Sequence, residues 1–492
     1  MNNLIVLPIV LPLLGAFLLP ILMRLSIGFA VWVGPAILAY GGWLLADQRF
    51  NGLAAPFSLA IGGFAPPLGI NLYVDGLALI FAFAAQLLGL LFWPFKLDQE
   101  SGRRQSLMLL LVAASTGLAL SGDLFNLYVF YELVAVATFG LIAVSATGAA
   151  YAATLRYLVL SGIGSVLTLV GIALIYGQTG TLNLAHLAQL APHQLDNPLG
   201  LSAFLAILIG VGVKAELFPV NTWVPEVYAT ASNRLSAFLA ALVSKLALLI
   251  ILRLVVLLFP QPEALQVMLA LGILGVLSGE LAAWRAKDMR RMLAFSSIGQ
   301  LGMIFIALAI PQGGGLLAVL ALALHHLVIK SGLFMLADGW DGAFDRLRGA
   351  AKAAPLGAGL FVLFSLSLIG FPPLPGFWAK FTLITELAAQ SSPLYLIGLT
   401  IFLLGTVIEA SYLFRLAALL YEKEPTESAQ KEKMPRPAGL ALITASLFGL
   451  GLVAATLFVS PLGDLLSQVS DQAGNASLYI DSVMSGQSGV TQ

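Results

Sequence analysis

The apolar stretches of this sequence carry a small set of ionisable side chains that could exchange protons: Glu132, Lys214, Lys245, His325, Lys330 and Lys380. A desolvated lysine gives up its proton more readily, because burial disfavours the charged ammonium. A nearby carboxylate has the opposite effect, so a change in the distance between Glu132 and Lys214 would load or unload a proton. Histidine titrates near neutral pH and suits a relay between lysines. Because an ammonium has no acceptor for a sodium ion, the set predicts a path for protons.

Structural roles are the alternative for each of these residues. Glu132 could form a salt bridge with a buried lysine, and Lys214 or Lys245 could bind backbone carbonyls freed by a proline. His325 and its neighbour His326 could be core histidines with satisfied hydrogen bonds. Against this, each charge at a helix centre costs roughly 2.5–3.5 kcal/mol on insertion scales. A chain that needed only to fold would gain from leucine at these positions.

Three further charged residues lie inside apolar stretches and are weaker candidates. Arg253 is predicted to extend along its helix toward the membrane interface, as long basic side chains do. Glu386 and Glu409 could join the line of charges, but both are predicted near helix ends.

Composition requires a membrane around this chain. Of its 492 residues, 59% are hydrophobic and 10% charged, with a mean hydropathy of +0.96, whereas soluble chains carry about 25% charged residues. The formal net charge is zero, which gives no indication of a nucleic-acid partner. Cysteine is absent, which excludes disulfides, thiolate metal sites and cysteine-bound iron–sulfur clusters. We therefore expect no cofactor, no metal site and no catalytic residue on this chain.

Apolar stretches of about 20 residues mark candidate membrane helices, and the sequence contains fourteen of them. They cover approximately 3–23, 26–46, 75–96, 106–121, 124–144, 154–176, 201–232, 235–259, 264–283, 290–311, 315–338, 357–390, 394–421 and 437–460. A Gly/Pro-bearing loop is expected at 47–74 and a polar tail at 463–492. Eighteen of the 24 lysines and arginines fall in loops after odd-numbered helices, and one, Arg49, follows an even-numbered helix. This asymmetry predicts that both termini lie outside the cytoplasm.

Two of the candidate helices are too long and are interrupted by proline. Pro219 interrupts the seventh, and Pro372, Pro373 and Pro375 interrupt the twelfth. A proline removes a backbone hydrogen bond, and lipid cannot satisfy the freed carbonyl, so a protein- or water-lined cavity is expected at each break. Helices 4–8 and 9–13 form two blocks of five, each with its fourth helix broken, as in an inverted-repeat transporter. The expected architecture is an all-α integral membrane protein with segments 1–105, 106–259, 264–421 and 422–492.

Three motifs resemble those of one family. The first runs from Lys214-Ala-Glu-Leu-Phe-Pro219 through Trp223-Val-Pro225-Glu226 to Ser236 and Lys245. The second is Lys287-Asp288 through Arg291-Met-Leu-Ala-Phe-Ser-Ser297, with Gly302 after it, and the third runs from Gly370 to Lys380. Together they resemble the large proton-translocating membrane subunits of respiratory complex I, membrane-bound hydrogenases and Mrp-type cation/proton antiporters. The resemblance covers roughly 75–420.

The resemblance implies fourteen helices with inverted five-helix repeats and a path through the ionisable residues above. Glu132 would match the family's glutamate on helix 5, and Lys214 and Lys245 its lysines on helices 7 and 8. Lys380 would match the charged residue of broken helix 12, and His325 and Lys330 the polar positions of helix 11. One departure concerns the turn between helices 7 and 8, where Ala231-Ser232 replaces the family's usual Ala-Pro.

Within the family, the run from Phe125 to Glu132 looks most like the D-type component of an Mrp-type antiporter. This implies a plasma-membrane protein that exchanges protons for Na⁺ or K⁺ with other membrane subunits as partners. A proton-pumping subunit of a complex I-like NADH dehydrogenase or of a hydrogenase is the nearest alternative, so the sequence leaves open whether the chain serves an enzyme. A self-sufficient solute transporter and a structural docking subunit remain as further alternatives.

Overall fold

The computed structural model describes residues 2–52, 55–98, 100–311, 314–340, 342–422, 436–437 and 439–485. The chain folds into two compact units, each assembled from separate segments. The first unit consists of Met1–Ala215, Leu242–Ala264 and Gln468–Gln492, and the second of Glu216–Ala241 and Leu265–Ser467.

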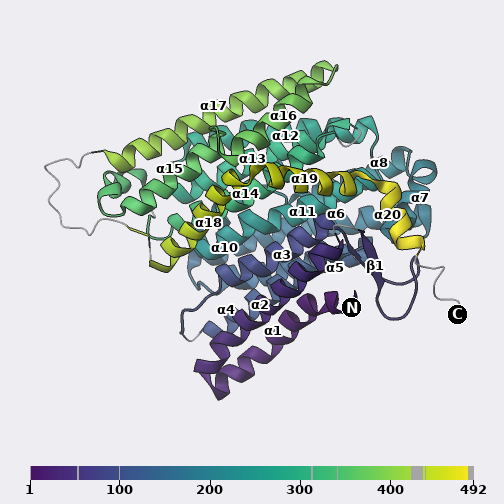
Figure 1. Cartoon of the computed structure of the whole chain (residues 1–492), viewed down its shortest axis with the longest axis horizontal. Coiled ribbons are helices and arrows are strands. Elements are labelled where there is room, and N and C mark those ends of the chain that lie inside the picture. Colours follow the sequence, from purple (N-terminus) through teal and green to yellow (C-terminus); the bar gives the residue numbers. More distant parts are fainter. Residues whose placement is uncertain are drawn as a thin grey trace. The chain divides into compact units, whose positions relative to one another are not determined.

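Helices dominate the first unit, with one short β-hairpin. In chain order it contains α1 (Leu7–Leu25), α2 (Ile27–Gly52), β1 (Phe57–Ala60), β2 (Asn71–Val74), α3 (Gly76–Leu91), α4 (Ser101–Leu120), α5 (Leu124–Ala143), α6 (Gly148–Thr179), α7 (Leu184–Gln194), α8 (Pro198–Gly212), α11 (Ser244–Leu257) and α20 (Ala476–Met484), most of which are labelled in Figure 1. The antiparallel hairpin pairs Phe57 with Val74. Aspartates begin two of these helices, since Asp75 accepts from the amide of Ala78 and Asp123 from that of Asn126.

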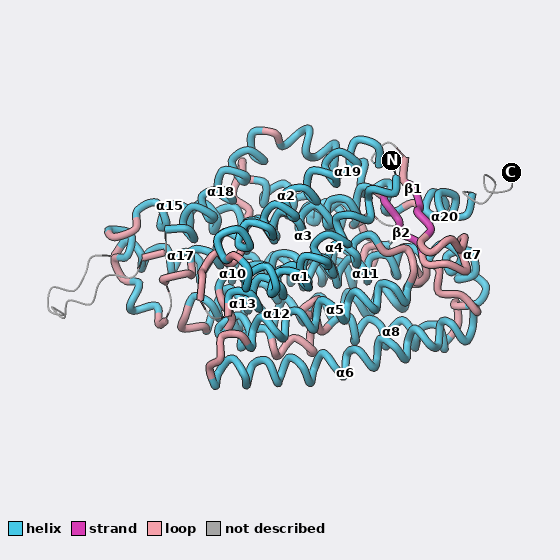
Figure 2. Tube along the Cα trace, turned by 90° about the horizontal axis from the view of Figure 1, so that it is seen from below, coloured by secondary structure: helices cyan, strands magenta, loops and turns pink. Residues whose placement is uncertain are grey.

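Small residues let α6 pack closely against α8. The two helices lie side by side (Figure 2), and Gly164, Gly171 and Gly210 lie at their contact. A Cβ atom on Gly164 would lie 2.7 Å from the carbonyl oxygen of Gly210. Helices in membranes associate through close packing of this kind, because lipid provides no hydrophobic driving force between them. The close contact holds the C-terminal end of α8, and with it the start of the break, against α6.

The second unit is built from helices of very different lengths. It contains α9 (Val224–Thr230), α10 (Asn233–Phe238), α12 (Pro262–Arg285), α13 (Met289–Leu308), α14 (Leu316–Leu336), α15 (Pro355–Ile369), α16 (Pro375–Ala388), α17 (Pro393–Tyr421), α18 (Gly439–Leu457) and most of α19 (Val459–Gly474). Pro355, Pro375 and Pro393 each stand in the first turn of a helix, where the missing amide hydrogen is not needed. α14 contacts α13, α15, α16 and α18, so its side chains are the core of this unit.

In the described part of the chain, ten helices are long and apolar enough to cross a membrane, or eleven if a pair bent by 112° before α15 is one span. Fourteen spans were expected, and that count stays a prediction. Several expected spans are interrupted or short: the seventh is divided into α8 and α9, and the twelfth into α15 and α16. α3 has 16 residues and α8 has 15, which at 1.5 Å per residue is less than the hydrocarbon thickness of about 30 Å.

Two segments differ from the expected irregular structure. The stretch 47–74 contains the end of α2 and the β1–β2 hairpin, and the expected polar tail is helical as α19 and α20. Apolar residues at helical spacing explain the second difference, since Leu466, Val469 and Ala473 are buried along one side of α19. The last expected tail residues, 486–492, lie outside the described residues.

We predict that Gly164→Ala destabilises the protein by about 1–3 kcal/mol, because the added methyl group overlaps the backbone of α8. Gly162→Ala is the matched control on the same helix, since a Cβ at Gly162 would meet nothing within 4 Å. Thermal unfolding of the purified protein in detergent compares the two variants. Equal melting temperatures would contradict the close packing of α6 on α8.

Candidate functional site

Lys214 lies in the break of the first unit. Helix α8 ends at Gly212, and Pro219 stands in the nonhelical stretch before α9 begins at Val224. The amide of Lys214 donates to the carbonyl of Val211 (3.1 Å), which continues the helical path for one turn. The side chain of Lys214 is 1% exposed. The break therefore presents a buried ammonium at the end of an apolar helix.

The ammonium of Lys214 has three partners, none of which fully neutralises it. Its Nζ atom donates to the hydroxyl of Ser161 (3.2 Å) and lies 3.2 Å from the centroid of the Tyr131 ring. Oε1 of Glu132 is 4.0 Å away, at the outer limit of an ion pair. That oxygen has no hydrogen-bond partner among the described residues, and the Glu132 side chain is 32% exposed. A small movement of Glu132 would make or break this ion pair.

Lys245 is the second buried lysine of the first unit. It is fully buried in α11, where its ammonium donates to the hydroxyl of Ser244 (3.2 Å). The helix reaches this position through a π-helical turn at Leu239–Val243. Such a turn is frequent at functional sites.

In the second unit, three of the candidate residues follow one another along α14. His325 shares a hydrogen bond with the hydroxyl of Ser367 on α15 (2.9 Å between Nε2 and Oγ). Lys330 is fully buried and donates to the hydroxyl of Ser296 (2.7 Å) and to the carbonyl of Leu293 (3.1 Å), both on α13. His326 contacts Ser297 at 3.4 Å. Hydroxyl groups therefore accompany each ionisable side chain, and a hydroxyl can both accept and donate a proton.

Lys380 lies at the second break and forms a buried ion pair. Pro372 and Pro373 stand between α15 and α16, and Pro375 is in the first turn of α16. The Lys380 ammonium donates to Oε2 of Glu409 on α17 (2.7 Å) and reaches the carbonyl of Ile369 at the break (3.4 Å). One lysine thus binds both a freed carbonyl and a carboxylate.

Buried carboxylates in the second unit are the residues that sequence reasoning undervalued or missed. Glu409, which was expected near a helix end, lies in the middle of α17, is fully buried and also accepts from the amide of Gln300 (2.6 Å). Glu216 accepts from the hydroxyl of Tyr228 (2.6 Å). Glu280 on α12 accepts from the hydroxyl of Tyr412 on α17 (2.9 Å). The signal for Glu280 and Glu409 was available, since each is an acidic residue inside an apolar run.

Arg253 does not extend toward the interface as expected. It is 6% exposed and forms an ion pair with Asp75 (2.6 Å between Nη2 and Oδ2). Its guanidinium lies 5.3 Å from the ring centroids of both Tyr73 and Tyr479. The pairing fixes α11 to the start of α3 and to α20, which indicates a structural role.

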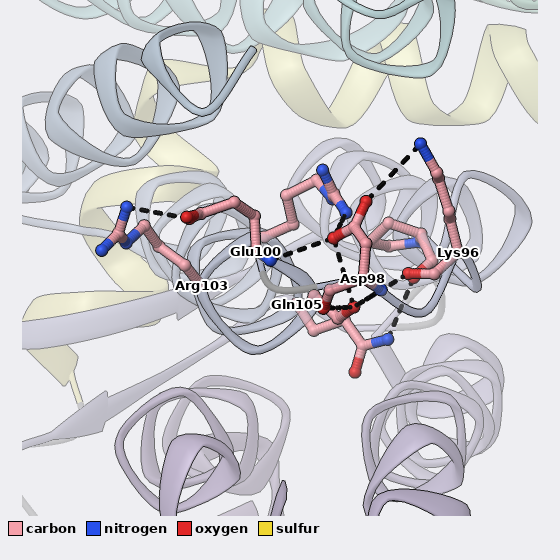
Figure 3. Close-up of polar contacts among 8 residues, drawn as sticks. Lys96, Asp98, Glu100, Arg103 and Gln105 are labelled. Carbon is pink, nitrogen blue, oxygen red and sulfur yellow. Dashed lines mark hydrogen bonds and ion pairs between the residues drawn. The ribbon is translucent and has the colours of Figure 1, made fainter. Parts of the chain in front are cut away.

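Acidic and basic side chains also gather in the loop before α4, outside the membrane-spanning segments. Figure 3 shows Asp98 beside Lys96, and Glu100 paired with Arg103 (2.8 Å). The hydrogen bond from Arg104 lowers the pKa of Asp98 to about 2. Asp98 is therefore ionised throughout the neutral pH range and cannot exchange protons there, so this loop is outside the candidate pathway.

The assembled residues suit proton exchange better than metal binding. No three His, Asp or Glu side chains in the described ranges are arranged to hold a metal ion. The first unit combines Glu132, Lys214 and Lys245, and the second combines His325, Lys330 and Lys380 with Glu409. In each unit a lysine at a helix break faces a glutamate from another helix.

Comparison with known proteins agrees with this arrangement. A family model described as NADH:quinone oxidoreductase/Mrp antiporter, TM, matches residues 121–408. The N-type component of the NADH-quinone oxidoreductase of Desulforudis audaxviator is 32% identical over 92% of this chain and 95% of its own length. The D-type component of the Na(+)/H(+) antiporter of Alkalihalophilus pseudofirmus is 30% identical over 98% of this chain and all of its own. A chain of the membrane-bound sulfane sulfur reductase, an archaeal respiratory membrane complex, superposes with a TM-score of 0.90 at 30% identity, covering 98% of this chain and 100% of that one.

We predict that Lys380→Met and Glu409→Leu each destabilise the protein by about 3–5 kcal/mol, because each leaves an uncompensated buried charge. The double variant Lys380→Met/Glu409→Leu should recover most of that loss, since it removes both charges together. Thermal unfolding of the three variants measures this coupling. Additive losses in the double variant would contradict a direct ion pair.

Proposed function

We propose that this chain, which belongs to the NADH:quinone oxidoreductase/Mrp antiporter membrane family, carries protons across the membrane as one subunit of a multi-subunit monovalent cation/proton antiporter. Its partners are the other membrane subunits of that complex. The chain itself moves the protons, and Na⁺ or K⁺ is the exchanged cation. The full-length match to a component of a Na(+)/H(+) antiporter supports this assignment.

The observation that carries the proposal is the loose pairing of Lys214 with Glu132. At 4.0 Å and without a hydrogen bond, Glu132 is close enough to favour the protonated lysine and free enough to move away. The surroundings of Lys214 are otherwise apolar or uncharged, so its proton is retained mainly by that carboxylate. A displacement of Glu132 releases the proton toward Lys245 and onward.

The second unit supplies the remainder of the path in this proposal. Protons pass along α14 by His325 and Lys330 and leave by Lys380, whose charge Glu409 balances. The broken pairs α8/α9 and α15/α16 are the fourth helices of two inverted repeats, and the count of fourteen spans belongs to the same proposal. The asymmetry of lysine and arginine places both termini outside the cytoplasm of a plasma-membrane protein.

A redox-driven proton pump is the second candidate. It is favoured by the 32% identity to a component of NADH-quinone oxidoreductase and by the similarity to a chain of an archaeal respiratory complex. The same buried lysines serve both functions, because the energy source would lie on other subunits. The two candidates therefore differ in what drives or accompanies proton movement.

We predict that everted vesicles containing this chain with its neighbouring subunits lose an artificial pH gradient when Na⁺ or K⁺ is added. Lys214→Ala should abolish this response and Glu132→Ala should weaken or abolish it, with the chain still inserted in the membrane. A pH-gradient dye records the collapse. Asp98→Asn is the control and should transport normally, because Asp98 lies outside the pathway and does not titrate near neutral pH.

The same vesicles distinguish the second candidate. A pH gradient that forms only after NADH or another electron donor is added, with no response to cations, would assign the chain to a redox-driven pump. Normal transport by Lys214→Ala would contradict the proposed pathway in either case.

A further inference from the structure

Glu280 is a fully buried carboxyl group in α12 that the proposed path does not use. Its Oε2 atom accepts from the hydroxyl of Tyr412 (2.9 Å), and its Oε1 atom has no hydrogen-bond partner among the described residues. Gly299 makes room for this side chain, since a Cβ at that position would lie 2.1 Å from Oε1. An ionised carboxylate held this deep without a basic group in contact would be costly. Glu280 therefore needs either a proton or a route to one.

Such a route leads from Lys330. The Lys330 ammonium donates to the hydroxyl of Ser296 (2.7 Å), and Ser296 in turn hydrogen-bonds the hydroxyl of Tyr412. Tyr412 then donates to Glu280. All four side chains are fully buried, so water does not compete for these bonds. Every donor in the line points the same way, from the ammonium to the carboxylate.

We propose that Ser296 and Tyr412 form a proton wire by which Lys330 and Glu280 exchange one proton. Lys330 gives a proton to the Ser296 oxygen, Ser296 gives its hydroxyl proton to the Tyr412 oxygen, and Tyr412 gives its own to Oε2 of Glu280. Three O–H bonds form, while one N–H and two O–H bonds break. Lys330 becomes a neutral amine, Glu280 becomes a neutral carboxylic acid, and the net charge does not change. Glu280 is thus a side store for the proton of Lys330.

Electrostatics make both ends of this exchange accessible. Transfer removes two separated charges from a medium of low dielectric constant, which offsets the loss of their attraction. The charged groups that act on Glu280 are Glu409 on α17, Lys380 on α16 and Lys330 on α14, and Tyr412 faces it directly. Because Lys380 and Gln300 both bind Glu409, that second carboxylate is held in its charged form and Glu280 is left as the acceptor. The inference rests on the proposed function in that the wire matters for transport only if Lys330 carries protons.

Two substitutions interrupt the wire at different points. Tyr412→Phe removes one hydroxyl, and Glu280→Gln removes the acceptor while keeping its size. Each should lower cation-dependent proton transport by the assembled complex on the order of tenfold to a hundredfold, and the double variant should be no worse than either single one. Tyr395→Phe is the matched control on the same helix, because Tyr395 donates to the carbonyl of Ala309 and is not part of the wire. It should transport normally.

Infrared difference spectroscopy of the whole complex between alkaline and neutral pH follows the proton itself. We expect the C=O band of a buried carboxylic acid, absent in Glu280→Gln and shifted in Tyr412→Phe, which loses a hydrogen bond to that group. If Glu280→Gln does not assemble, Tyr412→Phe and the infrared band still decide the matter.

Normal transport in both variants, additive losses in the double variant, or no band assignable to Glu280 would each overturn the wire. Loss of transport in Lys214→Ala together with normal transport in Tyr412→Phe and Glu280→Gln would overturn the wire alone. Normal transport in Lys214→Ala would instead overturn the proposed function.

Discussion

The cost of an uncompensated charge in a medium without water governs this structure. Each buried lysine has a different answer to that cost: Lys214 has a distant glutamate and an aromatic face, Lys330 has a hydroxyl and a carbonyl, and Lys380 has a close carboxylate. The closeness of the partner sets how easily a proton can leave. A close pair holds its proton, whereas a loose pair can release it when the partner moves.

The helix breaks answer the same constraint for the backbone. Proline removes a donor from the helix, and in a membrane the freed carbonyls must find partners within the protein. At the second break the Lys380 ammonium reaches the carbonyl of Ile369, and at the first the Asn221 amide reaches that of Glu216. The breaks therefore bring polar side chains and free backbone groups to the same place. That combination is what a proton path requires and what a simple membrane helix cannot provide.

The sequence predicted the charges better than their partners. Glu132, Lys214, Lys330 and Lys380 stand out because a charge in an apolar run has no structural excuse. Arg253 was misinterpreted because its partner Asp75 lies 178 positions earlier in the chain, where no local pattern connects them. Glu280 was missed because it lies close to the basic end of α12, and only its contact with Tyr412, 132 positions away, gives it a role. Long-range pairing is decided by how helices pack, which composition and spacing do not contain.

The most direct test of the central claim is the transport rate of Lys214→Arg in the reconstituted complex. Arginine keeps the positive charge and can still pair with Glu132, but it does not lose its proton at any accessible pH. If Lys214 carries protons, Lys214→Arg should assemble normally and fail to transport. Transport at the normal rate would mean that Lys214 provides only a fixed charge, and it would contradict the account.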